Sequence, residues 1–157
     1  MKKIPLTQGK FAIVDDADFE WLNQWKWRAL KGSNDNWYAM RRQRQNSKRI
    51  PVYMHREILK PSSNMLTDHK DHNGLNNQRN NLRAATSAQN HQNRRKHRGI
   101  SRFKGVCWNQ QYAKWQAQIK VKGKHFHLGR FLSEIEAAKV YDKAATKFFG
   151  DFACTNF

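Results

Sequence analysis

Acidic residues are missing from the middle of this chain. From His72 through Ser133 the sequence has no Asp or Glu, whereas thirteen Lys or Arg fall in the same stretch. So many like charges repel one another unless a polyanion lies close, and nucleic acid is the polyanion that basic proteins usually meet. The formal net charge of +18 agrees with this interpretation. Charge alone does not separate a nuclease from a DNA-binding regulator or a structural RNA-binding protein.

Long apolar runs and paired cysteines are also missing. No apolar run approaches the roughly 18 residues that span a membrane, and no segment has the pattern of a signal peptide. Cys107 and Cys154 form neither a CxxC pair nor a zinc-finger pattern, so we expect two buried thiols in a reducing compartment. We therefore expect a cytoplasmic protein with no membrane partner.

Aromatic residues are plentiful, and the first 56 residues favour β-structure. Six Trp, nine Phe and four Tyr supply enough apolar bulk for two compact cores. Alternating apolar and polar residues predict strands with one solvated face, and turn residues separate them. The expected elements are a strand at FAIV (11–14), a brief helix near DFEWLNQ (18–24), strands around Trp25–Trp27, WYAMRRQ (37–43) and RIPVYMHR (49–56), turns at GSNDN (32–36) and QRQNSK (43–48), and a helix at MHREIL (54–59) that ends before Pro61.

The last third of the chain has a different pattern. FKGVCWNQ (103–110), KWQAQIKVKG (114–123) and KHFHLGRF (124–131) alternate apolar and polar residues, which predicts a three-stranded antiparallel sheet. A helix should follow from Ser133, because Ser133 and Glu136 form a capping box, and it should end at Gly150. The cationic connector RRKHRG (94–99) has too few apolar residues to pack, so we place a domain boundary at 98/99.

Residues 67–93 carry a concentration of Asp, His and Asn. Asp68 and His69 are neighbours, and Asn81 and Asn90 follow within the same stretch. Carboxylate and amide oxygens suit Mg²⁺ or Mn²⁺, and a neutral histidine is a natural base near pH 7. A metal-dependent nuclease needs such a cation and such a base. Taken alone, the spacing is weak, and a polar, Asn-rich turn with incidental histidines explains it better.

The motifs MHR (54–56) and DHKDHNGLNNQRNNLRAAT (68–86), with Asn90, resemble the HNH endonucleases of phages and introns. The resemblance implies a ββα-metal fold over about residues 53–93. Asp68 and Asn90 would then bind one Mg²⁺ or Mn²⁺, His69 would be the general base, and Asn81 would orient the His69 ring or tie the loop. His55 and Arg56 match the family's HR pair, and would contact DNA phosphate or support the fold. His72 and Asn90 depart from the usual Gly and His.

The C-terminal motifs resemble the Apetala/ethylene-response-factor (AP2/ERF) DNA-binding domain over residues 101–157. The matching pieces are FKGV, KWQAQI, HLGRF, EAAKVYDKAA, GDFA and the final NF. In that family the sheet enters the major groove of DNA and the helix supports it. The alternation predicts the DNA-facing side chains, and the connector adds two cations that would track phosphate; together they are Lys104, Trp108, Gln118, Lys120, His125, His127, Arg130, Arg94 and Arg95. For each lysine, a solubilising surface charge is an equally good explanation.

The combined prediction is an α+β protein with an HNH domain at 1–98 and an AP2/ERF-like domain at 99–157. It would be an enzyme, a homing-type DNA endonuclease that hydrolyses phosphodiester bonds of double-stranded DNA with Mg²⁺ or Mn²⁺, in the cytoplasm of a bacterial or phage-infected cell. No obligate protein partner is implied. The alternative is a non-catalytic, sequence-specific DNA-binding regulator with a remnant HNH unit.

Overall fold

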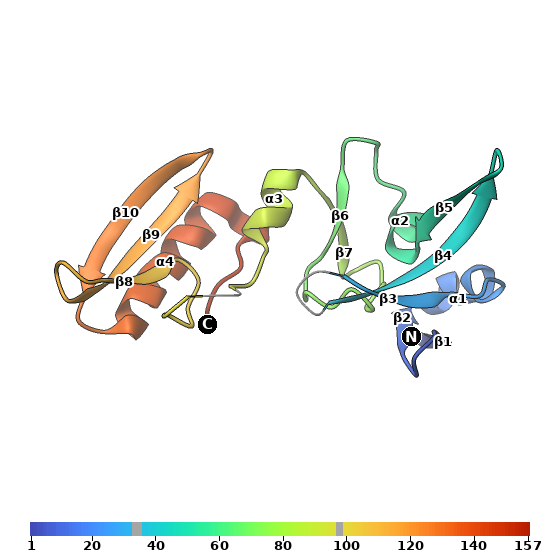
Figure 1. Cartoon of the computed structure of the whole chain (residues 1–157), viewed down its shortest axis with the longest axis horizontal. Helices are drawn as coiled ribbons and strands as arrows, with labels where there is room; N and C mark the ends of the chain where they lie inside the picture. The colour runs from blue at the N-terminus through green and yellow to red at the C-terminus, as the bar shows by residue number, and fades with distance from the viewer. Residues whose placement is uncertain (33–35, 97–98) are drawn as a thin grey trace. The chain divides into compact units, whose positions relative to one another are not determined.

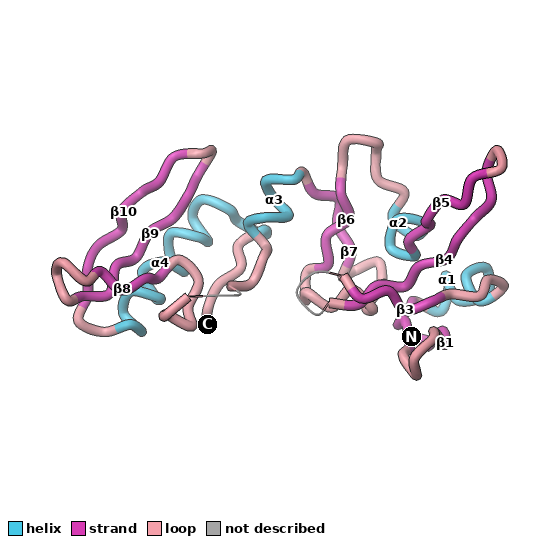
Figure 2. The backbone as a smooth tube through the Cα atoms, in the orientation of Figure 1, coloured by secondary structure: helices cyan, strands magenta, loops and turns pink. Residues whose placement is uncertain are grey.

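The chain folds into two compact units, residues 1–87 and 88–157, each with its own core (Figure 1). The computed structural model describes residues 1–32, 36–96 and 99–157. Small antiparallel sheets and short helices make up both units, so the predicted α+β class is confirmed (Figure 2). The predicted turn at 32–36 and connector at 94–99 fall partly outside the described residues. The functional boundary at 98/99 stays a prediction.

The first unit contains a two-stranded sheet, a three-stranded sheet and a hairpin, with two short helices between them. Its elements are β1 (Lys2–Pro5), β2 (Phe11–Val14), α1 (Asp16–Asn23), β3 (Arg28–Lys31), β4 (Trp37–Gln45), β5 (Lys48–Tyr53), α2 (Met54–Leu59), β6 (Leu66–His69) and β7 (Leu82–Ala85). The predicted strand at 11–14 and helix at 54–59 are confirmed. The predicted turn between β4 and β5 is also confirmed, since Asn46 and Ser47 both have positive φ, as a tight hairpin requires.

The core of the first unit gathers apolar residues from the strands and both helices. Ile4, Val14, Leu22 and Met54 are fully buried there. Leu22 lies on the inner face of α1, and its carbonyl accepts a 2.8 Å hydrogen bond from the buried indole of Trp27. The helix is thereby fixed to the segment that leads into β3.

The loop between β6 and β7 returns to the N-terminal hairpin. Ile13 pairs with Asn76 through a parallel bridge, with both backbone hydrogen bonds at 2.8 Å. Three residues further on, Arg79 donates to Asp18 on α1 through Nε at 2.8 Å and Nη2 at 2.7 Å. Asp18 is only 2% exposed. The loop and the N-terminus therefore close the unit around a buried carboxylate.

Replacing Arg79 by Met should lower the free energy of unfolding of this unit by about 2 kcal/mol. The change removes a two-point hydrogen-bonded partner and leaves the Asp18 carboxylate buried, with the Trp21 indole, 3.1 Å away, as its one remaining side-chain partner among the described residues. Urea unfolding of the full chain measures the change. Arg28→Met, at an exposed position of β3, is the matched control and should alter stability by less than about 0.5 kcal/mol. Equal losses in the two variants would contradict the role of the ion pair.

The second unit is a three-stranded antiparallel sheet, in the order β10-β9-β8, packed on one helix. This confirms the predicted sheet and helix. A short helix at the junction of the units comes first and a 3-10 turn comes last. The elements are α3 (Ser87–Gln92), β8 (Val106–Asn109), β9 (Lys114–Val121), β10 (Lys124–Phe131), α4 (Glu134–Phe149) and η2 (Gly150–Phe152).

Small side chains let α4 lie close against the sheet. Ala137, Ala138 and Ala145 are fully buried, and Tyr141 is 3% exposed. They pack in two clusters against apolar residues of β8 and β9 that include Val106, Ala117 and Ile119. The predicted cap is confirmed, because Ser133 accepts a hydrogen bond from the amide of Glu136. Ile135 and Phe148 continue the same three- and four-residue spacing along α4, but both are nearly half exposed.

Candidate nucleic-acid interface

The strand register divides the side chains of the C-terminal sheet between two faces. Directly paired residues share a face, and Val106, Ala117 and Gly129 are paired across the three strands, on the side that packs against α4. The opposite face is polar and solvent-accessible. We call it the outer face; it consists of Cys107, Asn109, Lys114, Gln116, Gln118, Lys120, His125, His127 and Arg130.

A β-bulge brings two of the predicted residues onto this face. His127 and Arg130 are three residues apart, so strict alternation would place them on opposite faces. The register shifts between His127 and Gly129, with His127 opposite Gln118 and Arg130 opposite Gln116. Leu128 is the extra residue of β10 at this point, and a bulge redirects the side chains beyond it. The two side chains therefore share the outer face.

Several outer-face side chains are held in place by their neighbours. The guanidinium carbon of Arg130 lies 3.8 Å from the ring centre of Tyr112, in the turn between β8 and β9. Asn109 donates to the side-chain oxygen of Gln116 at 2.9 Å. Such contacts reduce the rotamer freedom that binding would otherwise remove, so this face is partly ordered before any ligand arrives.

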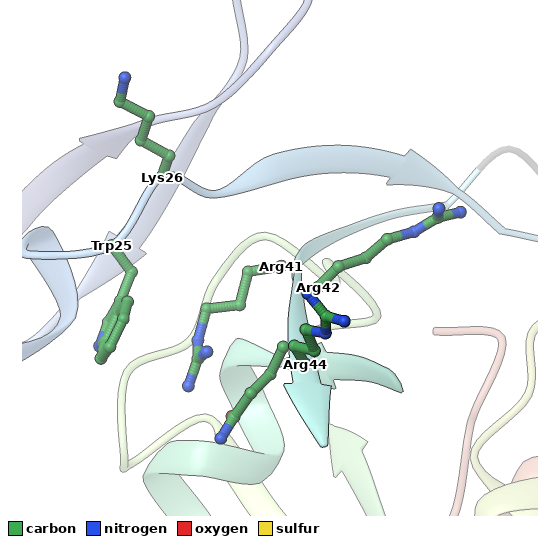
Figure 3. Close-up of a pocket in the computed structure, with 6 residues that line it drawn as sticks. Trp25, Lys26, Arg41, Arg42 and Arg44 are labelled. Atoms are coloured by element: carbon green, nitrogen blue, oxygen red, sulfur yellow. The ribbon is translucent and has the colours of Figure 1, made fainter. Parts of the chain in front are cut away.

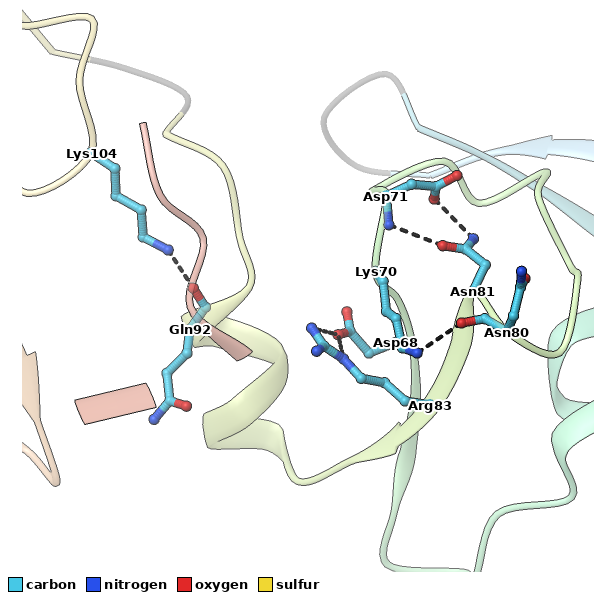
Figure 4. A network of polar contacts seen from close by, with 8 residues as sticks. All are labelled: Asp68, Lys70, Asp71, Asn80, Asn81, Arg83, Gln92 and Lys104. Carbon is cyan, nitrogen blue, oxygen red and sulfur yellow. Dashed lines mark hydrogen bonds and ion pairs between the residues drawn. The ribbon is translucent and has the colours of Figure 1, made fainter. Parts of the chain in front are cut away.

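Two of the predicted residues lie elsewhere. Trp108 is paired with Trp115 in the register, and their rings meet edge to face at 5.1 Å, so Trp108 points to the α4 side of the sheet. Lys104 precedes β8, and its ammonium donates to the carbonyl of Gln92 at the end of α3 (Figure 4). Burial lowers the pKa of Lys104. Lys104 therefore links the end of α3 to the segment that leads into β8.

The sequence reasoning also missed some outer-face residues. Lys114, Gln116 and Asn109 share the face with Gln118, but the motif comparison did not select them. The signal was available, because a tight turn between β8 and β9 fixes which residues are opposite one another. Arg94 and Arg95, in the connector, are exposed as expected.

In the first unit, Asp68 and His69 are neighbours on β6 and both are 5% exposed. Arg83 of β7, directly opposite Asp68 in the register, donates to its carboxylate through Nε at 2.8 Å and Nη2 at 2.7 Å (Figure 4). The His69 Nε2 atom is 3.4 Å from the side-chain oxygen of Asn77. Burial lowers the pKa of His69, which makes this ring a weaker base than an exposed histidine.

Asn81, expected to orient His69, organises the loop. Its amide donates to the Asp71 carboxylate at 2.9 Å, and its oxygen accepts from the Asp71 amide at 3.1 Å (Figure 4). The same amide also donates to the Asn76 carbonyl at 2.8 Å. These contacts match the alternative expectation, that Asn81 ties the loop together. Asn90 lies on α3 and belongs to residues 88–157, so the two expected metal ligands fall in different units.

The expected HR pair supports the fold of the first unit. His55 is 9% exposed and lies among three aromatic rings, with centres 5.2 Å away at His69, 5.5 Å at Tyr53 and 5.7 Å at Tyr38. Arg56 donates to the carbonyl of Met65 at 3.3 Å, across the loop that precedes β6. Both side chains therefore have structural contacts that account for their presence.

The described residues hold no group of three or more His, Cys, Asp or Glu arranged to bind a metal ion. Arg83 already supplies the positive charge beside Asp68, and a divalent cation there would meet a like charge. The side chains as arranged do not fit the expected ion at that carboxylate. The Mg²⁺ or Mn²⁺ inferred from the HNH motifs stays a prediction.

Comparison with known proteins finds transcription factors. The chain is 50% identical over 62 residues to the AP2-like ethylene-responsive transcription factor PLT2 of Arabidopsis thaliana, and 48% identical over 62 residues to CRL5 of Oryza sativa subsp. japonica and to ANT of Arabidopsis thaliana. Each match covers 38% of this chain and 10–11% of the relative. The chain therefore spans about a tenth of the length of the curated relatives it matches. No family model matches it.

These relatives correct the functional prediction. An HNH endonuclease, a hydrolase that cuts phosphodiester bonds, was expected, and that is wrong because the proteins found are AP2-like transcription factors. β6, β7 and α3 do follow one another as strand, strand and helix, but no comparison supports an HNH ββα-metal fold.

No helix in the described part of the chain is both long and apolar enough to cross a membrane. A bacterial or phage-infected cell was expected, whereas the relatives come from plants. The similarity over 38% of the chain supports an AP2/ERF DNA-binding domain.

Proposed function

We propose that this chain is a sequence-specific regulator that binds double-stranded DNA through the outer face of its C-terminal sheet. One observation carries the proposal: the register gathers amide, imidazole, ammonium and guanidinium groups on a single face of three strands. The major groove of B-DNA admits a small β-ribbon, and its base edges present donors and acceptors that match these groups. The similarity to AP2-like transcription factors supports the same assignment.

The side chains of the outer face divide naturally into two roles. Gln118 can donate and accept at once, as recognition of adenine requires, and Arg130 can donate twice to guanine. Lys120 and the connector residues Arg94 and Arg95 are exposed cations that suit phosphate contacts, which position the protein without selecting a sequence. On β10, His125 is opposite Lys120 and His127 is opposite Gln118, so both add imidazoles to the same face.

The first unit is non-catalytic in this proposal. Its Asp68–Arg83 pair and the Asn81 network hold β6, β7 and their loop together, and they remain as a remnant of an HNH-like unit. Such a unit would add contacts to the DNA backbone. His55 and Arg56 would contribute only by stabilising the fold of the first unit.

Arg130→Ala should weaken binding to the preferred site about 10- to 100-fold and relax the preference at one base position. The loss follows from removing one two-point base contact, which contributes about 1–3 kcal/mol of discrimination. Selection from a random pool of duplexes first identifies the site, and fluorescence anisotropy then gives the dissociation constants. Lys139→Ala, on the exposed side of α4, is the control and should change little. Failure of the selection to enrich any duplex would contradict sequence-specific binding.

A further inference from the structure

The hairpin formed by β4 and β5 concentrates positive charge in the first unit. We call residues 41–49, with sequence RRQRQNSKR, the arginine hairpin. No Asp or Glu occurs from Asn36 through Arg56 in the sequence. Four of its five cations, Arg42, Arg44, Lys48 and Arg49, are exposed and make no ion pair within the part of the chain that the structure describes.

Three of these arginines share one face. Arg44 is directly opposite Arg49 in the register, and Arg42 precedes Arg44 by two residues. Like charges directly opposite one another destabilise a strand pair, and among the described residues no acidic side chain forms an ion pair with them. A polyanion laid against this face would remove the repulsion and release its own counterions.

The base of the hairpin is fixed by Arg41. This residue is 8% exposed, donates to Glu57 at 3.3 Å, and places its guanidinium carbon 4.4 Å from the ring centre of Trp25 (Figure 3). Glu57 is thus engaged below the hairpin and does not neutralise the exposed arginines. The Arg41 Nε atom has no hydrogen-bond partner among the described residues. The exposed cations therefore extend from a strand whose buried Arg41 is held by Glu57 and Trp25.

A shallow hollow of about 360 Å³ lies at the base of the hairpin, lined by Trp25, Lys26, Arg41, Arg42, Gln43 and Arg44. The polar side chains among these described residues are cationic or amide, and none of them is a carboxylate. Figure 3 shows Trp25 beside Arg41, with Lys26 and Arg42 extending away from them. The hollow therefore presents hydrogen-bond donors and positive charge, which is the chemistry that recognises phosphate.

We propose that the arginine hairpin is a second DNA-binding surface, which takes the phosphate backbone of duplex DNA without selecting its sequence. This inference rests on the proposed function, since it adds a second contact to the same ligand. Because both units belong to one chain, a backbone contact in the first raises the effective concentration of DNA at the second. It should therefore increase affinity and leave base preference unchanged.

The test compares triple variants of the full chain on the same fluorescein-labelled duplexes, selected and shuffled. Arg42→Gln/Arg44→Gln/Arg49→Gln should lower affinity about 10- to 100-fold and reduce the slope of log K against log salt by about 2 to 3, since each phosphate contact contributes roughly 0.9. The ratio of affinities for the two duplexes should not change. Arg42→Lys/Arg44→Lys/Arg49→Lys keeps the charge and should retain most of the slope.

The matched control is Lys139→Gln/Lys143→Gln/Lys147→Gln, which removes the same charge from exposed positions of α4. The inference is overturned if hairpin and control variants bind alike while Arg130→Ala still loses affinity; the proposed function then stands. The inference is also overturned if the hairpin variant changes the ratio of affinities for the two duplexes, or if it loses affinity only for a structured RNA competitor. If the parent chain prefers no duplex, the proposed function fails, but the salt slope on shuffled duplex still tests the hairpin. Circular dichroism confirms that each variant is folded.

Discussion

Gly105→Ala should abolish DNA binding by unfolding the second unit. A Cβ at this position would lie 1.9 Å from Cδ2 and 2.3 Å from Cε2 of the Tyr141 ring. Tyr141 is 3% exposed and sits in the middle of α4, between buried alanines, so the ring cannot move aside without separating helix and sheet. Gly105 also has a φ of +75°, a backbone conformation that disfavours any residue with a side chain. We expect a loss of about 4 kcal/mol or more, a large part of the stability of a small domain.

Thermal unfolding followed by circular dichroism, together with anisotropy on duplex DNA, measures this effect. Gly123→Ala is the matched control, because Gly123 has a similar φ of +83 but a Cβ there meets nothing within 4 Å. It should cost only about 1–2 kcal/mol, from backbone conformation alone. If the two variants lost equal stability, the close approach to Tyr141 would not be the cause.

Acidification from pH 6.5 to 4.5 should destabilise the first unit by about 2–3 kcal/mol. Burial, and then the charges of His69 and Arg56, lower the pKa of His55 from its usual 6.5 to about 3. In the unfolded chain the ring takes up a proton below pH 6.5, whereas in the folded chain it remains neutral until about pH 3. The unfolded state therefore binds more protons in this interval, and stability falls as the pH falls.

The pH effect can be assigned with a variant of the same size. His55→Phe keeps a ring among Tyr38, Tyr53 and His69 but cannot take up a proton, so the slope of stability against pH should become much shallower. Burial also lowers the pKa of His69, which should leave a smaller slope of the same sign. Urea unfolding, with hydrogen exchange of peptides from α2 and β6, reports on this unit. Tyr53→Phe retains both histidines and should keep the full slope; an unchanged slope in His55→Phe would contradict the assignment.

The second unit was largely predictable because its signals are local. Alternation marked the three strands, and Ser133 with Glu136 marked the start of α4. The bulge at Leu128 was not predictable in the same way, since it depends on how β10 pairs with β9. Trp108 was wrongly predicted to lie on the outer face. Alternation shows which residues of a strand share a face, but only the pairing with β9 shows which of the two faces lies against the helix.

The polar stretch of the first unit shows why a motif can mislead about chemistry. Asp68, His69 and Asn81 were expected to act together, yet each contacts a different partner, and the motif does not show which residues pair. Asp68 pairs with Arg83 across the hairpin, and His69 is buried beside His55 from α2. The difference between an exposed ligand and a compensated, buried carboxylate is set by tertiary packing.

The bridge between Ile13 and Asn76 has a consequence for synthesis on the ribosome. The N-terminal strands emerge first, but their neighbours in the loop before β7 are translated more than sixty residues later. Contacts of such long sequence separation form late, and domains made during translation fold as whole units. The nascent hairpin of β1 and β2 must therefore wait with an unpaired edge until Arg79 has left the exit tunnel. Slow translation just before that point would prolong its exposure to chaperones and proteases.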